Sequence, residues 1–307
     1  MTISSNNTDL SNVKPWDLRA GCQKVPLWAP KKSQVTLLTG SPDNPQRTSM
    51  IPCGQWWLSP EDLPEGCAYA FEVEGKGPFP DPRARLYLPG SQTWGVTANI
   101  GAISRSSQWH PEDKLLGKVW YELHLGTFTP AGTLKAARAK LPYLADLGVE
   151  VIELMPTAFF PGERGWGYDG VGLYALFNPY GSPMDLVDFI DRAHELGIAV
   201  TQDLVLNHLG VCGNYLAQFA PYFSARHHTP WGDGYNLDGA DSTMVREFLL
   251  GAALALLRDY GFDGLRLDAV HEIKDDSKLH LLAELSLRVA DLSQNLGRPL
   301  TLVAESD

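Results

Sequence analysis

From residue 118 onward, short apolar runs alternate with amphipathic segments, and this alternation limits the folds open to the chain. The apolar runs cover residues 118–126, 149–156, 198–208, 262–271 and 300–305. Between consecutive runs, apolar residues recur at helical spacing, and strands that alternate with helices form a parallel sheet covered by those helices. A closed eight-stranded β/α barrel needs roughly 250 residues. The sequence therefore predicts either an open sheet or an incomplete barrel of about five strands.

Residues 1–110 have a different sequence pattern. Short β-like runs such as "QVTLLTG" and "AYAFEVEG" are separated by Pro, Gly and Asn, which is typical of an antiparallel β-sandwich. Residues 76–107 are rich in Pro and Gly, and we interpret them as a connector. Two structural units follow from this difference, a sandwich with its connector at 1–110 and a β/α unit at 111–307.

Charge and targeting features restrict the partners. Lys and Arg total 25 against 36 Asp and Glu, a net charge of -11, which disfavours nucleic acid and anionic membranes as partners. The first residues have neither a basic start nor an apolar run, so we expect no secretory signal. Four cysteines without a CxxC pair indicate free thiols in a reducing compartment. We therefore expect a cytoplasmic enzyme with a neutral substrate.

The run at 262–271 places charged residues at the end of a strand. Strand side chains alternate, so Arg266 and Asp268 share one face while Leu265 and Leu267 share the other. If the leucines pack on helices, an arginine and a carboxylate point inward together, and each satisfies the other. The arginine would keep Asp268 ionised, as a nucleophilic carboxylate requires. A purely structural ion pair is an equally good interpretation of this strand alone.

Two neighbouring runs add further polar groups at their ends. Asp203, Asn207 and His208 end the third run, and Glu305 ends the fifth. Asp203 could accept a hydrogen bond from Arg266, and His208 could donate one to a substrate hydroxyl, although a lone histidine is more often structural. Two carboxylates at neighbouring strand ends suit glycoside hydrolysis, in which one attacks the anomeric carbon and the other protonates the leaving oxygen.

Two loops carry exposed-looking aromatic residues. Trp166 and Tyr168 lie among glycines at 165–170, while Trp231 and Tyr235 lie in "RHHTPWGDGYNLDG" at 226–239. Aromatic rings suit the apolar faces of sugars, but packing within the loops is an equally good interpretation for any one of them. His227 and His228 lack the spacing of metal ligands, and no phosphate-binding or EF-hand loop occurs, so we expect no metal and no cofactor.

Three strand ends together resemble the alpha-amylase family of glycoside hydrolases (family 13). "DLVLNH", "FDGLRLDAVH" and "VAESD" are similar to its first three signature regions, in the same order. The resemblance implies an immunoglobulin-like, carbohydrate-binding-type sandwich followed by a (β/α)8 barrel. It implies Asp268 as the nucleophile, Glu305 as the general acid/base and Arg266 as the residue that positions the nucleophile. It assigns sugar binding to the remaining site residues, which are Tyr168, Asp203, Asn207, His208, Trp231 and His271.

Four segments also resemble one branch of that family. Residues 121–133, 164–171, 226–239 and 266–277 are similar to hydrolases that release trehalose from the end of a malto-oligosaccharide. The implied substrate is an α-1,4-glucan that ends in trehalose. A branching enzyme and a glucan-binding protein without catalytic activity are the alternatives. Retention of Asp268, Arg266 and Glu305 favours an enzyme over a pure binding protein.

The fourth signature region of the family, a His-Asp pair on a later strand, has no counterpart here. The resemblance assigns stabilisation of the transition state to that Asp. We therefore expect the 307 residues alone to release trehalose poorly or not at all. An assay of trehalose release from a malto-oligosyltrehalose checks this, and turnover typical of a complete family member would contradict it.

Overall fold

The computed structural model describes residues 24–307. The expected absence of a secretory signal and the thiol of Cys22 concern residues outside this range. Cys53, Cys67 and Cys212 are unpaired in the structure. Among the described residues, no helix is both long and apolar enough to cross a membrane.

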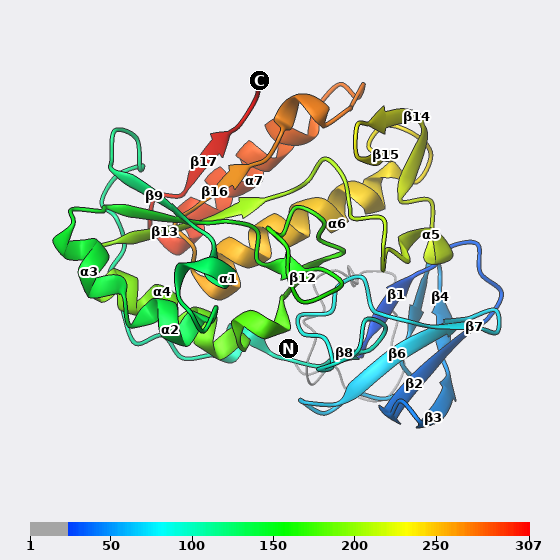
Figure 1. Cartoon of the computed structure of the whole chain (residues 1–307). Helices are drawn as coiled ribbons and strands as arrows, with labels where there is room; N and C mark the ends of the chain where they lie inside the picture. Colours follow the sequence, from blue (N-terminus) through cyan, green and yellow to red (C-terminus); the bar gives the residue numbers. More distant parts are fainter. Residues whose placement is uncertain (1–23) are drawn as a thin grey trace.

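The first part of the described chain forms two antiparallel sheets, at the lower right of Figure 1. One sheet has the order β1 (Pro26–Trp28), β5 (Trp56–Leu58), β4 (Ile51–Cys53). The other has the order β3 (Asn44–Ser49), β2 (Val35–Ser41), β6 (Ala68–Val73), β7 (Lys76–Phe79), and β8 (Gly95–Val96) also pairs with β6. Antiparallel pairing is therefore confirmed. The connector at 76–107 was predicted too broadly, because β7 and β8 fall inside it and extend the second sheet.

A five-stranded parallel sheet follows, and it confirms the predicted β/α alternation. Its strands are β9 (Trp120–Leu123), β10 (Val151–Leu154), β13 (Ala199–Leu204), β16 (Gly264–Leu267) and β17 (Thr301–Ala304). They lie in chain order across the sheet, from β9 at one edge to β17 at the other. Their carboxyl ends consequently meet at one edge of the sheet, where the polar residues of the sequence analysis are placed.

Seven α-helices lie in the connections between these strands, and Figure 1 labels each of them. They are α1 (Leu125–Phe128), α2 (Leu134–Arg138), α3 (Leu141–Asp146), α4 (Pro183–Glu195), α5 (Leu216–Phe219), α6 (Ser242–Ala255) and α7 (Leu281–Leu296). The spacing of apolar residues over 134–148 predicts a single amphipathic helix. The structure has two, because Pro142 has no N–H to donate to the Arg138 carbonyl. Ser182 caps α4 through a capping box with Asp185.

The interval between β13 and α6 is long and carries its own small elements. These are α5 (Leu216–Phe219) and an antiparallel hairpin of β14 (Phe223–Thr229) and β15 (Gly232–Tyr235). The hairpin lies at the upper right of Figure 1, above α6 and α5. It brings residues of the 226–239 segment to the carboxyl edge of the parallel sheet.

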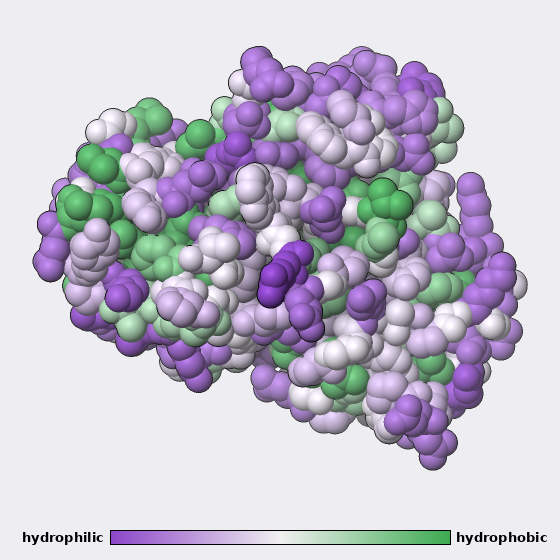
Figure 2. All heavy atoms as spheres, in the orientation of Figure 1, coloured by the Kyte–Doolittle hydropathy of each residue, from purple (hydrophilic) through white to green (hydrophobic). Residues whose placement is uncertain are grey.

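Aromatic contacts join the two antiparallel sheets to the parallel sheet. Tyr87 stacks on Phe159 with ring centroids 3.8 Å apart, and Phe79 meets Phe219 edge-on at 5.9 Å. One continuous cluster of buried side chains extends from Val25 to Leu300 through both parts. The surface in Figure 2 is predominantly polar along its upper edge, above α7 and the hairpin, whereas apolar patches appear over α3. The two parts therefore share one core.

Replacing Phe159 with Ala tests this shared core. Phe159 is buried against Tyr87, so the substitution should lower the free energy of unfolding by about 3 kcal/mol, measured by urea titration. Val211→Ala is the matched control, because Val211 is 82% exposed and its loss should change stability by less than about 0.5 kcal/mol. Equal effects of the two substitutions would contradict the packing described.

Candidate active site

One guanidinium group lies at the centre of the carboxyl edge. Arg266 on β16 donates to Asp203 Oδ2 at 2.8 Å and to Asp268 Oδ1 at 3.0 Å. Its other terminal nitrogen is 3.5 Å from Glu305 Oε2. The three carboxylates belong to the ends of β13, β16 and β17, which are neighbours in the sheet. Three strand ends thus meet at a single positive charge.

Strand register explains why these groups meet. Asp203 pairs with Arg266 across β13 and β16, and Arg266 pairs with Val303 across β16 and β17. Leu265 and Leu267 are 0% and 3% exposed, so the alternate residues of β16 are in the core. The predicted division of this strand into a leucine face and an Arg-Asp face is confirmed, as is the predicted contact between Asp203 and Arg266.

A strained residue connects the two candidate catalytic carboxylates. Ala269, directly after Asp268, has φ 41° and ψ 55°, a left-handed conformation that is costly for a residue with a Cβ. In this conformation its backbone N–H donates to Glu305 Oε2 at 2.7 Å. The N–H of Val270 donates to the backbone carbonyl of Glu305 at 2.9 Å. The turn after β16 therefore fixes Glu305 beside Asp268.

The electrostatics of the site are set by burial. The side chain of Asp203 is fully buried, and burial raises its pKa to about 7, although Arg266 and a hydrogen bond from Tyr168 lower it. Desolvation lowers the pKa of Arg266, but the Asp203 carboxylate beside it outweighs this and raises it overall. Arg266 remains charged and faces three carboxyl groups. The site therefore favours binding of a proton or of a developing positive charge.

The other predicted binding residues surround this cluster. Tyr168 donates its hydroxyl to Asp203 Oδ2 at 2.8 Å. Asn207 donates its amide to Asp268 Oδ2 at 3.1 Å and to the Asp268 carbonyl at 2.8 Å. His208 Nε2 is 3.1 Å from the Tyr168 carbonyl, and burial lowers the pKa of its imidazole. Trp231 stacks on His208 with ring centroids 5.0 Å apart. The structure thus brings these four residues to the Arg266 cluster.

His271 and two aromatic residues are placed differently. His271 Nδ1 is 3.4 Å from Ser306 Oγ, so it lies next to the Glu305 end of the site. Trp166 is exposed, as a sugar-binding surface requires. Tyr235 is buried and stacks on Phe223 inside the hairpin, so of the two interpretations left open, packing within the loop holds for this residue.

Two local features hold Tyr168 in place. Gly167 has φ 96°, and a Cβ there would lie 2.2 Å from the carbonyl oxygen of Pro156, so the loop needs glycine at this position. His124 at the end of β9 has Nε2 3.0 Å from the Gly165 carbonyl and 3.1 Å from the Tyr180 hydroxyl. Sequence reasoning missed His124, although its place at a strand end was a signal that could have identified it.

One trio of side chains has the geometry of metal ligands. Among the described residues, His227, Asp238 and Asp276 place ligand atoms within 4.8 Å of one another. Arg226 already lies there, with its guanidinium 2.9 Å from Asp238 Oδ2 and 3.6 Å from Asp276 Oδ2. This guanidinium supplies the positive charge that a cation would bring, so the trio fits an ion-pair network better than a metal.

Comparison with known proteins identifies relatives of this chain. Residues 97–234 match the model of the alpha-amylase catalytic domain. A crystal structure of a Salmonella typhimurium protein assigned as an alpha amylase superposes with a TM-score of 0.84 at 40% identity, covering 92% of this chain and 47% of that one. The chain belongs to the alpha-amylase family of glycoside hydrolases. It has the alpha-amylase fold, and its five-stranded parallel sheet fits part of the barrel of that fold.

Within the family, the chain is similar to malto-oligosyltrehalose trehalohydrolases. It is 44% identical to the one from Arthrobacter ramosus over 93% of this chain and 50% of that protein. It is 38% identical to the one from Saccharolobus solfataricus over 92% of this chain and 49% of that protein. The chain spans about half the length of these curated relatives.

The raised pKa of Asp203 predicts a definite pH dependence of stability. The unfolded value is about 3.9, so the folded protein binds this proton more tightly. The contribution of Asp203 to the free energy of unfolding should therefore fall as the pH rises from about 4 to 7. Asp203→Asn removes this contribution. Urea titrations at pH 5 and pH 8 should show the wild type losing stability relative to the variant, and parallel pH profiles would contradict the assignment.

Proposed function

We propose that the protein containing these residues is a retaining glycosidase. It would cleave the α-1,4 bond next to the terminal trehalose of a malto-oligosyltrehalose and release trehalose. The observation that carries the proposal is the contact of one guanidinium, that of Arg266, with both Asp268 and Glu305. The similarity to trehalohydrolases supports the substrate class.

In the first step, Asp268 attacks the anomeric carbon and forms a covalent glycosyl ester. Arg266 binds its Oδ1 and Asn207 binds its Oδ2, so both oxygens are held in place for attack. Glu305 gives its proton to the oxygen of the departing trehalose. Ala269 N–H occupies Glu305 Oε2, and among the described residues no hydrogen bond engages Oε1, which leaves Oε1 to carry that proton.

In the second step, water hydrolyses the ester. The ionised Glu305 takes a proton from a water molecule, whose oxygen attacks the anomeric carbon and releases Asp268 as a carboxylate. The product therefore keeps the anomeric configuration of the substrate, and Glu305 is again protonated for the next cycle. We assign sugar binding in the cleaved subsite to Tyr168 and His208, with Trp231 and His271 as further contacts.

We also propose the domain organisation and the setting. Residues 1–110 would form an immunoglobulin-like sandwich of the carbohydrate-binding type, and residues 111–307 would supply five strands of a (β/α)8 barrel. The first part is supported by two antiparallel sheets whose buried side chains, from β1 and β5 in one sheet and β2 and β6 in the other, belong to the same core. A cytoplasmic location, with neither nucleic acid nor membrane as a partner, is supported by the net charge of -11.

A branching enzyme is the second candidate. The chain is 32% identical to a Nitrosomonas europaea 1,4-alpha-glucan branching enzyme over 71% of this chain and 33% of that protein. In that reaction a glucan 6-hydroxyl would replace water in the second step. Incubation with amylose separates the two, because only a branching enzyme forms α-1,6 linkages from it.

Asp268→Asn tests the nucleophile. Trehalose release from maltotriosyltrehalose by the full-length protein should fall by about 10³-fold or more, because the amide cannot form the glycosyl ester. Asp233→Asn is the control, since Asp233 is an exposed carboxylate at the tip of the hairpin and, within residues 24–307, forms its ion pair with His228 alone. Near-normal trehalose release by Asp268→Asn would contradict the assignment.

Glu305→Gln tests the proton donor. This variant should lose cleavage of maltotriosyltrehalose but keep the first step with an α-glycosyl fluoride, because fluoride departs without protonation. Fluoride release measured with an ion-selective electrode checks this. Equal loss on both substrates would show that Glu305 does not act as the acid.

A further inference from the structure

We propose that Asp238 is a positioning residue that fastens the β14–β15 hairpin to the loop after β16. This loop covers residues 268–280 and begins at the candidate nucleophile. The effect would be to hold Trp231 against His208 and so to fix the binding surface for the glucan. The role in substrate binding rests on the proposed function, whereas the fastening itself does not.

Asp238 joins two segments that are far apart in the sequence. Its Oδ2 accepts from the backbone N–H of Asp276 at 2.9 Å, in the loop after β16. The same oxygen lies 2.8 Å from His227 Nε2 and 2.9 Å from a guanidinium nitrogen of Arg226, both on β14. The side chain is only 5% exposed. A buried carboxylate thus binds strand and loop at once, and we call this group the Asp238 clasp.

The charge on the clasp persists at ordinary pH. Burial alone would raise the pKa of Asp238, but the Asp276 N–H, His227 and Arg226 outweigh it and lower the pKa to about 2. A carboxylate held in this way strengthens each of its hydrogen bonds, since charge-assisted bonds are stronger than neutral ones. The Asp238 carboxylate is therefore charged at neutral pH.

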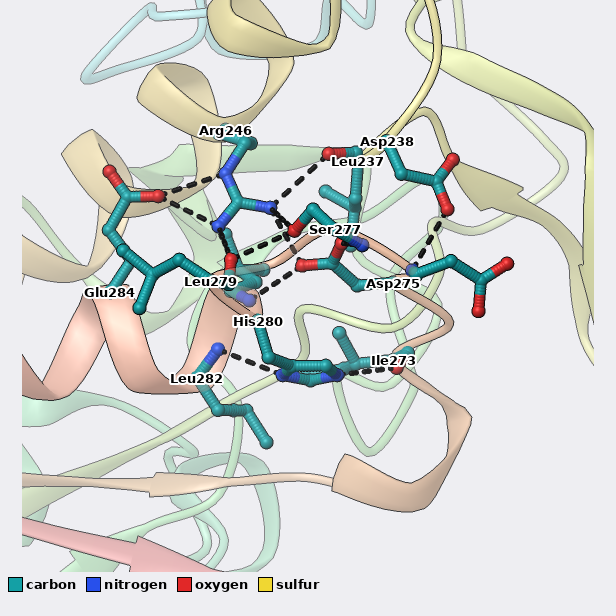
Figure 3. A network of polar contacts seen from close by, with 12 residues as sticks. Leu237, Asp238, Arg246, Ile273, Asp275, Ser277, Leu279, His280, Leu282 and Glu284 are labelled. Carbon is teal, nitrogen blue, oxygen red and sulfur yellow. Dashed lines mark hydrogen bonds and ion pairs between the residues drawn. The ribbon is translucent and has the colours of Figure 1, made fainter.

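Arg246 on α6 reinforces the junction between hairpin and loop by binding Leu237, the residue next to Asp238, as Figure 3 shows. Its Nη1 donates to the Leu237 carbonyl at 3.2 Å and to Asp275 Oδ2 at 2.7 Å. Its Nη2 donates to the Leu279 carbonyl at 2.6 Å. Asp275 is fully buried and also accepts from the Leu281 N–H at 2.6 Å. Leu237 and Asp238 are thus both tied to the loop after β16.

The β14–β15 hairpin and the loop after β16, which Asp238 joins, both also contact the candidate active site. The hairpin carries Trp231 between its strands, and this ring stacks on His208 at the end of β13. The loop starts at Asp268, which Arg266 and Asn207 hold. Through the clasp, the ends of β13 and β16 are linked above the sheet as well as within it. Without it, the junction between hairpin and loop would depend on the contacts of Arg246 and on the 3.6 Å ion pair of Arg226 with Asp276, and Trp231 would be held less firmly against His208.

The consequence is a specific kinetic signature. Trp231 is exposed, and its ring stacks on His208 rather than on Arg266 or its three carboxylates, so it acts on binding rather than on bond cleavage. Releasing the clasp should raise KM for maltotriosyltrehalose about tenfold and leave kcat within about threefold of wild type. A residue with a purely structural role would lower stability without this split.

The test compares Asp238→Asn with Asp233→Asn in the full-length protein, at a temperature at which all variants are folded. Both change an Asp that pairs with a hairpin histidine, but Asp233 does not contact the loop after β16. Hydrogen exchange should speed up at residues 226–240 and 273–281 in Asp238→Asn only. Its Kd for maltotriosyltrehalose and its KM should rise about tenfold, while Asp233→Asn matches wild type.

Each outcome decides a separate point. Unchanged exchange in Asp238→Asn would overturn the clasp. Faster exchange with unchanged Kd and KM would overturn its role in positioning Trp231. If the wild type neither binds nor cleaves maltotriosyltrehalose, the proposed function is wrong, and the exchange data still decide whether the clasp exists.

Discussion

The contact of Arg266 with three carboxylates is the interaction on which the rest of the site depends. A partly buried guanidinium is costly unless its charge is paired, and Asp203, Asp268 and Glu305 supply that pairing from three strand ends. Those strands must be parallel and in the observed register for the groups to meet. In the proposed mechanism, the same contact holds the Asp268 carboxylate beside the anomeric carbon, where the oxocarbenium-like transition state develops positive charge.

The remaining architecture holds this cluster from two sides. Below the carboxyl edge, the aromatic contacts of Tyr87 with Phe159 and of Phe79 with Phe219 join the antiparallel sheets to the parallel one in a single core. Above it, the hairpin and the loop after β16 are fastened at Asp238 and Arg246. Rigid support on both sides suits a reaction that needs two carboxylates at a fixed separation.

Sequence patterns predicted the parts of the structure that depend on local periodicity. Alternation along β16 was enough to place Arg266 and Asp268 on one face, and the βα rhythm was enough to predict parallel strands with their polar ends together. Local periodicity gave a wrong prediction where a single residue overrides the pattern, because Pro142 divides the expected helix into α2 and α3. Local periodicity also left open whether Tyr235 faces a sugar or packs its loop, because burial depends on the partner strand, and in the structure Tyr235 packs on Phe223. Asp238 and Arg246 act through contacts between distant segments, which leave no periodic signal in the sequence.

The central claim is that Asp268, held by Arg266 and Asn207, attacks the sugar. Trapping the covalent intermediate with a fluorinated α-glycosyl fluoride, followed by peptide mass mapping, tests it most directly. The account predicts one added glycosyl group per protein molecule, located on the peptide that contains Asp268 and lost when Asp268 is replaced by Asn. Label on a different carboxylate, such as Asp203 or Glu305, would contradict it.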